Sequence, residues 1–284
     1  MKNSNSSCRA RAAFFLLFLV SLWSFGHPAY ADQVVTISLS RSAAGCATGT
    51  FTSIDQSYIL TEAADPSTAD AVLLLFSGGG GKLRVADNEL DINSNNFLVR
   101  TRHLFAAQGF HVAVMDATTD FLTCAGGLRN RRTSDKFTSD VQSVAADLRA
   151  RYPGLPLWVV GTSRGSTAAA QAAVFVVPSP AGVVLTSSLT VTTTATVFDV
   201  PLNLIIAPTL IVVHKDDGCA VTPPSGAMLI KQALTSTAKV KIRQFKGGFP
   251  ALDPNPCQAL TPHGYIGLEP KVVKKIAKWI RHNS

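Results

Sequence analysis

The sequence predicts an α/β fold in which a mostly parallel β-sheet is covered by helices on both faces. Short apolar runs bounded by glycine or proline alternate with stretches whose apolar residues recur at helical spacing. Some of the runs are apolar throughout, as expected of strands buried on both faces. Strands separated by helices require crossover connections, and these favour parallel pairing.

The N-terminal half begins with a predicted β-hairpin, formed by 33–40 and 51–60. The apolar run AVLLLF at 71–76 is the next strand. Segment 95–110 has apolar residues at helical spacing and a glycine near its end, so we expect one helix there. Segment 111–117 is another buried strand.

The C-terminal half continues the alternation. Segment 133–152 places apolar residues at helical spacing before a Pro-Gly stop. The final segment, 269–282, has an apolar stripe opposite its lysines, which predicts an amphipathic helix. Further strands are expected at 156–161, 181–187, 207–217 and 238–245, and further helices at 164–175 and 225–237.

Residues 1–31 have the pattern of an export signal. A basic start precedes the apolar segment 12–25, and small residues at Ala29 and Ala31 predict cleavage before Asp32. The apolar segment is short for a membrane span, which needs about 20 residues, so an uncleaved anchor is the less favoured alternative. The expected location is the periplasm or the extracellular space, and the sequence does not distinguish these.

Residues 32–284 are expected to form one domain. No repeat or linker divides them, and no second segment is apolar enough for stable membrane insertion after cleavage. The formal net charge is +8, and loss of Lys2, Arg9 and Arg11 with the leader lowers it to +5. This mild excess lacks interleaved aromatic residues or a binding motif, so we predict no nucleic-acid partner. The oligomeric state is left open.

Four cysteines follow the leader: Cys46, Cys124, Cys219 and Cys257. An even number in an exported chain favours disulfides, and these four allow three pairings. Neither a CxxC motif nor a Cys/His cluster with the spacing of zinc ligands is present, so we predict no metal site.

Ser163 stands between Gly161 and Gly165, where a predicted strand meets a predicted helix. Small neighbours allow a sharp strand-to-helix turn that exposes the hydroxyl, and the helix start stabilises nearby negative charge. A serine nucleophile needs a base, and the base needs an acid that orients it. The structural alternative is a tight turn with an inert serine.

The candidate base and acid lie in loops after later strands. His263 precedes the C-terminal helix, and Asp216 and Asp217 end segment 207–217. Reactive groups in α/β sheets collect at the carboxyl ends of the strands. The chain order of serine, aspartate and histidine is therefore consistent with a catalytic triad.

These motifs resemble those of the α/β-hydrolase superfamily, specifically its exported bacterial members. The resemblance runs from AVLLLFSGGGG through GTSRGS and VHKDDGC to PHGYIG, nearly the whole chain beyond the leader. It implies an α/β-hydrolase fold with a minimal cap or none, because only 187–207 is available for one. In the family the acid often stands in an H-x-x-D context, which favours Asp217 and keeps Asp216 as the alternative.

The resemblance also implies an oxyanion hole. Segment 76–81, FSGGGG, matches the family's loop after the third strand, so the backbone amides of Gly79, Gly80 and Arg164 are the candidates. Ser77 replaces the histidine of the HGGG form, which leaves open which amide serves. The same glycines do not fit a phosphate loop, because Phe76 and Leu83 occupy two required positions.

A Cys219–Cys257 bridge would tie the predicted acid loop to the predicted base loop, which leaves Cys46 to pair with Cys124. Otherwise each cysteine closes some other loop. We interpret His214 as a packed histidine. The three loop arginines 129, 131 and 132 are interpreted as solvated, and binding of an acidic substrate group is the less favoured alternative. Asp116 and Asp120 are expected to line the pocket or to cap their loop.

The resemblance implies a serine hydrolase of carboxylic esters that forms an acyl-enzyme and uses no cofactor. Ser163 would be the nucleophile, His263 the general base and then acid, and Asp217 the residue that orients His263. A peptidase, an amidase or a thioesterase would use the same three residues. A non-catalytic binding protein of the same fold is the alternative from another class.

Overall fold

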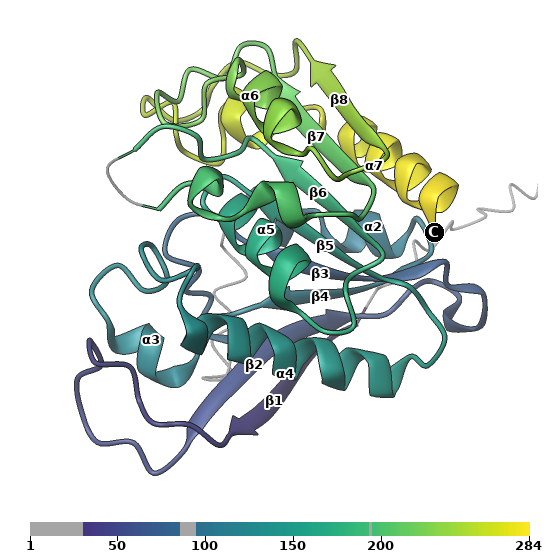
Figure 1. The fold of residues 1–284 in the computed structure, drawn as a ribbon. Coiled ribbons are helices and arrows are strands. Elements are labelled where there is room, and N and C mark those ends of the chain that lie inside the picture. Colours follow the sequence, from purple (N-terminus) through teal and green to yellow (C-terminus); the bar gives the residue numbers. More distant parts are fainter. Residues whose placement is uncertain (1–30, 86–94, 193–194) are drawn as a thin grey trace, which may run out of the picture.

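The computed structural model describes residues 31–85, 95–192 and 195–284, which form an eight-stranded sheet with helices on both sides (Figure 1). The strand order is β1-β2-β4-β3-β5-β6-β7-β8. Strands β1 (Asp32–Leu39) and β2 (Ile54–Thr61) form the predicted antiparallel hairpin, in which Asp32 faces Thr61.

Strand β2 is also antiparallel to β4 (Phe110–Met115), and every later neighbour pair is parallel. The predicted mostly parallel sheet is therefore confirmed. The remaining strands are β3 (Ala71–Phe76), β5 (Leu157–Thr162), β6 (Gly182–Thr186), β7 (Thr209–His214) and β8 (Val240–Phe245). Because they are parallel, the loops that follow β5, β7 and β8 lie at one end of the sheet (Figure 1).

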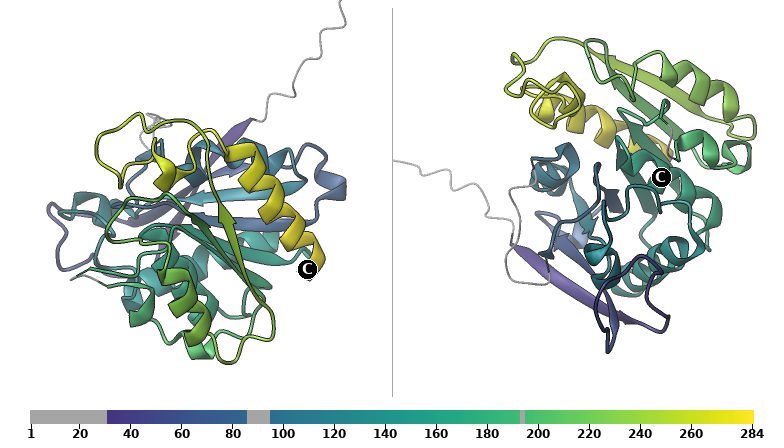
Figure 2. Two further views of the ribbon diagram at one scale, coloured as in Figure 1. Left: turned by 90° about the horizontal axis from the view of Figure 1, so that it is seen from above. Right: turned by 90° about the vertical axis from the view of Figure 1, so that its left-hand side faces the viewer.

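The helices divide between the two faces of the sheet. Buried residues of α4 (Asp135–Arg151), α5 (Gly165–Phe175) and α6 (Gly226–Ala233) belong to one hydrophobic core. Buried residues of α1 (Phe97–Arg100), α2 (Arg102–Ala106) and α7 (Glu269–Asn283) belong to a second core. The left view of Figure 2 shows α7 and α6 on opposite sides.

One predicted helix is interrupted and one helix was not predicted. Segment 95–110 forms α1 and α2 in place of a single helix, and the junction is Thr101, whose hydroxyl donates a 2.6 Å hydrogen bond to the carbonyl of Phe97. Helix α3 (Thr119–Thr123) is the unpredicted one. At five residues, it is too short to show a helical period in the sequence.

The segment that follows β6 carries no α-helix among its described residues. It holds the 3₁₀ helices η3 (Val197–Asp199) and η4 (Leu202–Leu204). Two other 3₁₀ helices are η1 (Pro66–Thr68) and η5 (Pro262–Gly264). The short elements after β6 agree with the expected minimal cap.

The predicted leader lies outside the described residues, except for Ala31. None of the helices in the described ranges is both long and apolar enough to cross a membrane. Cys46 and Cys124 lie at disulfide distance, with their Cα atoms 5.2 Å apart. This bond attaches the loop after β1 to the residue that follows α3.

Candidate active site

Ser163 occupies a sharp turn between β5 and α5. Its backbone has a φ of 53°, a left-handed conformation that is uncommon outside glycine. A Cβ at Gly161 would lie 2.1 Å from the carbonyl oxygen of Gly165, and a Cβ at Gly165 would lie 2.0 Å from that of Phe76. The turn therefore requires glycine at both positions.

His263 and Asp217 are brought together from two different loops. Nδ1 of His263 lies 2.9 Å from Oδ2 of Asp217, and both side chains are buried. The hydroxyl of Thr222 lies 3.2 Å from the same carboxylate oxygen and 3.1 Å from Nδ1. The other oxygen, Oδ1, accepts the backbone N–H of Cys219 at 2.9 Å. The carboxylate is thus held at both oxygens.

The neighbouring aspartate lies elsewhere. Asp216 is exposed, and its backbone N–H donates to Nδ1 of His214 at 3.0 Å. Nε2 of His214 lies 2.8 Å from the carbonyl oxygen of Gly247, so both ring nitrogens have partners. This geometry favours Asp217 over Asp216 as the partner of His263, and it makes His214 a packed histidine.

The loop that carries His263 is attached to β6 and β7 by side chains that sequence reasoning did not identify. The Ser187 hydroxyl donates to the carbonyl of His263 at 2.8 Å. Tyr265, fully buried, donates to the carbonyl of Val212 at 2.9 Å, and its hydroxyl lies 3.0 Å from that of Ser187. Burial is the main cause that raises the pKa of Tyr265. No sequence motif marks these partners, because they meet across 53 to 78 residues of chain.

Cys219 and Cys257 also lie at disulfide distance, with their Cα atoms 4.5 Å apart. Cys219 belongs to the loop that carries Asp217, and Cys257 precedes His263 in the next loop. The two cysteine pairs expected from the sequence are therefore the pairs that the structure contains. The second pair connects the two loops at the site.

A cavity of about 560 Å³ connects these residues to solvent. Ser163 and His263 line it, together with both cysteines of the second disulfide. Among the described residues, Ser163 makes no hydrogen bond to Nε2 of His263. Such bonds are often long before substrate binds.

The glycine loop after β3 contributes one wall of the cavity. Gly78 and Gly79 line it beside Ser163, and a Cβ at Gly78 would lie 3.1 Å from the Cβ of Ser163. In the described part of the chain, the N–H of Gly79 donates no hydrogen bond. Gly80 instead lines a neighbouring hollow with Lys82, and a Cβ at Gly80 would lie 2.9 Å from the carbonyl oxygen of Gly126. Of the two predicted glycines, the geometry favours Gly79.

No protein-family model and no curated protein sequence matches this chain. Solved structures do match. A peroxisomal α/β-hydrolase from Saccharomyces cerevisiae aligns with a TM-score of 0.59 at 12% identity over 90% of both chains. An esterase from Pyrococcus furiosus gives 0.58 at 10% identity over 89% of this chain and 91% of its own.

A dienelactone hydrolase from Anabaena variabilis gives a TM-score of 0.55 at 16% identity, over 89% of this chain and 98% of its own. The chain has the α/β-hydrolase fold. At these identities the similarity establishes the fold alone, so the chemistry has to be argued from the site.

On this α/β-hydrolase fold, Arg132 is not the solvated residue that was expected. Its side chain is buried, and Nη2 donates to the carbonyls of Ser77 at 3.0 Å and Gly79 at 3.2 Å. The prediction was wrong because backbone carbonyls of the distant glycine loop accept the guanidinium N–H groups, a contact that no local sequence pattern indicates. Arg131 is half-buried and donates to the carbonyl of Gly127 at 2.8 Å, whereas Arg129 is exposed at the cavity.

Asp116 and Asp120 cap loops and do not line the α/β-hydrolase cavity. Asp116 accepts the backbone N–H groups of Leu83 at 2.6 Å and Val85 at 2.9 Å, which holds the chain that leaves the glycine loop. Burial is the main cause that raises the pKa of Asp116 to about 6, although these N–H groups oppose the shift. Asp120 pairs with Arg41 at 2.7 Å.

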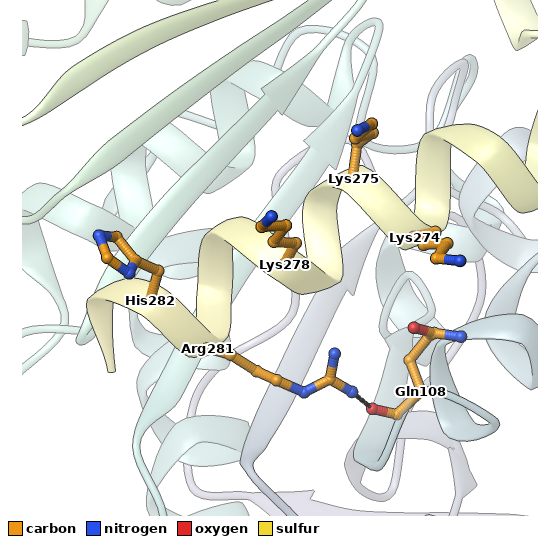
Figure 3. Close-up of a pocket in the computed structure, with 6 residues that line it drawn as sticks. All are labelled: Gln108, Lys274, Lys275, Lys278, Arg281 and His282. Atoms are coloured by element: carbon orange, nitrogen blue, oxygen red, sulfur yellow. Dashed lines mark hydrogen bonds between the residues drawn. The ribbon is translucent and has the colours of Figure 1, made fainter.

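The described residues contain no group of three or more His, Cys, Asp or Glu side chains placed to hold a metal ion. A second hollow, of about 520 Å³, lies beside α7 and is lined mainly by cationic side chains (Figure 3). Its described lining residues include no serine, threonine or cysteine that could act as a nucleophile. The cavity at Ser163 is therefore the candidate active site of this α/β-hydrolase fold.

Proposed function

We propose that the protein is a serine hydrolase of carboxylic esters, with Ser163 as nucleophile, His263 as general base and Asp217 as the orienting acid. The observation that carries the proposal is the 2.9 Å contact between His263 and Asp217 in the wall of the cavity that Ser163 also lines. A strand-to-helix turn with a left-handed serine is the arrangement expected of a nucleophile on this fold.

In the first step, Oγ of Ser163 attacks the acyl carbon of the ester while Nε2 of His263 takes the hydroxyl proton. Because Nδ1 is bound to Asp217, the carboxylate holds the tautomer that leaves Nε2 able to accept. Collapse of the tetrahedral intermediate breaks the bond to the alcohol, which receives the proton from His263. Water then attacks the acyl-enzyme by the same route and releases the acid.

The oxyanion of the tetrahedral intermediate is expected to accept N–H groups from Arg164 and Gly79. Arg164 follows the nucleophile at the start of α5, where the helix dipole also favours negative charge. Gly79 has a φ of 58°, which glycine adopts without strain. One such donor contributes about 3 to 4 kcal/mol of transition-state stabilisation.

Structural similarity supports esters over amides as substrates. The described residues between β6 and β7 form 3₁₀ helices and no α-helix, which supports a site with a minimal cap. Solved structures of similar fold include an esterase from Pyrococcus furiosus and a carboxyl esterase from Bacillus coagulans, the latter with a TM-score of 0.53 at 12% identity.

The test is covalent labelling of the purified, oxidised protein with a fluorophosphonate probe, followed by mapping of the adduct by mass spectrometry. We expect one adduct per chain on Ser163, absent in Ser163→Ala and strongly reduced in His263→Ala. A folded protein that stays unlabelled would contradict the proposal and support a non-catalytic role. Paired ester and amide substrates then separate an esterase from an amidase.

We further propose that residues 1–31 are removed on export and that residues 32–284 form a single domain. The two cysteine pairs at disulfide distance support an oxidising compartment. Intact mass of the protein recovered from bacterial cell fractions tests this. A mature N-terminus at Asp32, with both disulfides formed, is the expected result, and a full-length chain retained in the membrane would contradict it.

A further inference from the structure

Among the described residues that line the cavity, the charged side chains are those of Arg129 and Arg164, and both are cationic. None of the described lining residues is an aspartate or a glutamate. The other polar lining side chains include the uncharged amides of Asn95, Asn255 and Gln258. The cavity therefore presents positive charge and hydrogen-bonding groups next to the nucleophile.

A third guanidinium strengthens this positive field. Arg132 is buried beneath the glycine loop, and it donates hydrogen bonds to the carbonyl oxygens of Ser77 and Gly79. Burial first, and then the charge of Arg164, lower the pKa of Arg132 to about 9. Burial and then the charge of Arg129 lower the pKa of Arg164. The charge of Arg164 thus acts on Arg132, and the charge of Arg129 acts on Arg164.

Some arginines of the described residues are paired with carboxylates. Arg41 bonds Asp120 and Asp140, and Arg102 bonds Asp32. Arg129 lines the cavity, and its side chain makes no hydrogen bond or ion pair with any part of the chain that the structure describes. A guanidinium without a counter-charge beside a reaction centre is stabilised when an anion binds.

We propose that Arg129 and Arg164 form an anion subsite, and that the preferred substrate is an ester carrying a second, negatively charged group such as a carboxylate. This inference rests on the proposed function, because it assigns the substrate class of the same site. A guanidinium presents paired N–H donors that match the two oxygens of a carboxylate, and phosphonate and phosphate oxygens fit the same donors.

The hollow beside α7 is the competing place for an anion. Figure 3 shows Lys274, Lys275 and Lys278 projecting from α7, while Arg281 reaches the carbonyl of Gln108. The three lysines are exposed, and Arg281 is also paired with Asp70 at 2.5 Å. Lys278→Gln therefore provides a charge-matched control at a second cationic surface.

The test compares nitrophenyl hydrogen adipate with its neutral methyl ester, with subtraction of the spontaneous hydrolysis of each. We expect the wild-type protein to prefer the anionic ester by about tenfold in kcat/KM, and the preference to shrink when salt is raised to about 0.5 M. Arg129→Gln and Arg164→Gln should each lower the anionic-to-neutral ratio about tenfold. Lys278→Gln should leave the ratio within about twofold of wild type. A phosphonate analogue of the anionic ester shows whether the subsite prefers a carboxylate.

An equal loss on both esters in Arg129→Gln would overturn the subsite, since the arginine would then act on the oxyanion alone. If Ser163→Ala leaves hydrolysis unchanged, the proposed function fails. The subsite is then tested separately, by measuring how tightly the esters bind. Calorimetric titration of Ser163→Ala with ethyl hydrogen adipate and with diethyl adipate provides that measurement. The subsite is supported if Ser163→Ala binds the anionic ester more tightly than the neutral one and the double variant Ser163→Ala/Arg129→Gln does not. Equal binding of the two esters to Ser163→Ala overturns it.

Discussion

Oδ2 of Asp217 lies 2.9 Å from Nδ1 of His263, although the two residues are 46 positions apart in the chain. The contact depends on the parallel sheet, which brings the loops after β7 and β8 to the same edge. Asp217 has a second anchor at the N–H of Cys219, so its orientation is set before any substrate binds.

Asp217→Asn should lower kcat on a neutral nitrophenyl ester by about 10³- to 10⁴-fold, because an amide facing Nδ1 no longer holds the productive tautomer of His263. Steady-state kinetics on the purified variant measures the effect. Asp216→Asn is the matched control, since its side chain is exposed, and its kcat should stay within about twofold of wild type. The opposite ranking of the two variants would assign the acid to Asp216.

Thr222→Val removes the hydroxyl that lies within hydrogen-bond distance of both Asp217 and His263. A hydrogen bond to a charged group contributes about 1.5 to 3 kcal/mol, so we expect kcat to fall at least about tenfold with little change in KM. The melting temperature, recorded alongside, identifies a general loss of structure. A variant with unchanged kcat would show that the carboxylate is positioned without the threonine.

Removal of either disulfide should lower stability, but only removal of Cys219–Cys257 should also lower activity. The chain-entropy account gives each bond about 4 kcal/mol, for loops of 38 and 78 residues. Replacing Cys219 and Cys257 by serine should reduce both the free energy of unfolding and kcat, because the two site loops lose their connection. Replacing Cys46 and Cys124 by serine should mainly reduce stability. Urea unfolding and ester kinetics on both double variants decide this.

Gly165→Ala should destabilise the protein by at least about 3 kcal/mol, because the new methyl group overlaps the carbonyl of Phe76 and the backbone has no room to yield. Urea unfolding measures the loss. Gly45→Ala is the matched control, since a Cβ there meets nothing within 4 Å. Equal stability of the two variants would mean that the turn at Ser163 is looser than described.

Asp116 should make the free energy of unfolding depend on pH in the acidic range. Its folded pKa of about 6 lies above the ordinary value of 3.8, so the folded state holds the proton more tightly than the unfolded state. The tighter proton binding contributes about 3 kcal/mol to the free energy of unfolding. This contribution is fully present below about pH 4 and is lost as the pH rises to about 6.

Urea unfolding of wild type and Asp116→Asn across this range isolates the effect, since Asp32 and Asp120 have lowered pKa values and act in the opposite direction in both proteins. The difference in unfolding free energy between the two proteins should narrow as the pH rises through this range. A constant difference would show that Asp116 is ionised throughout.

Local sequence patterns were sufficient to predict the alternation of strands and helices and the position of the sharp turn at Ser163. Both depend on local patterns, namely apolar periodicity and the small residues at Gly161 and Gly165. The sequence also narrowed the cysteine pairing, once the loops of Asp217 and His263 were expected to meet.

Features that depend on contacts between distant parts of the chain became visible only in the folded structure. Asp217 is buried against His263 whereas the adjacent Asp216 is exposed, and the sequence of the loop does not indicate this difference. The fold also brings Thr222 and Tyr265 to the site, and it buries Arg132 beneath the glycine loop. Burial and long-range hydrogen bonds leave no local periodicity, so these residues could not be found from the sequence.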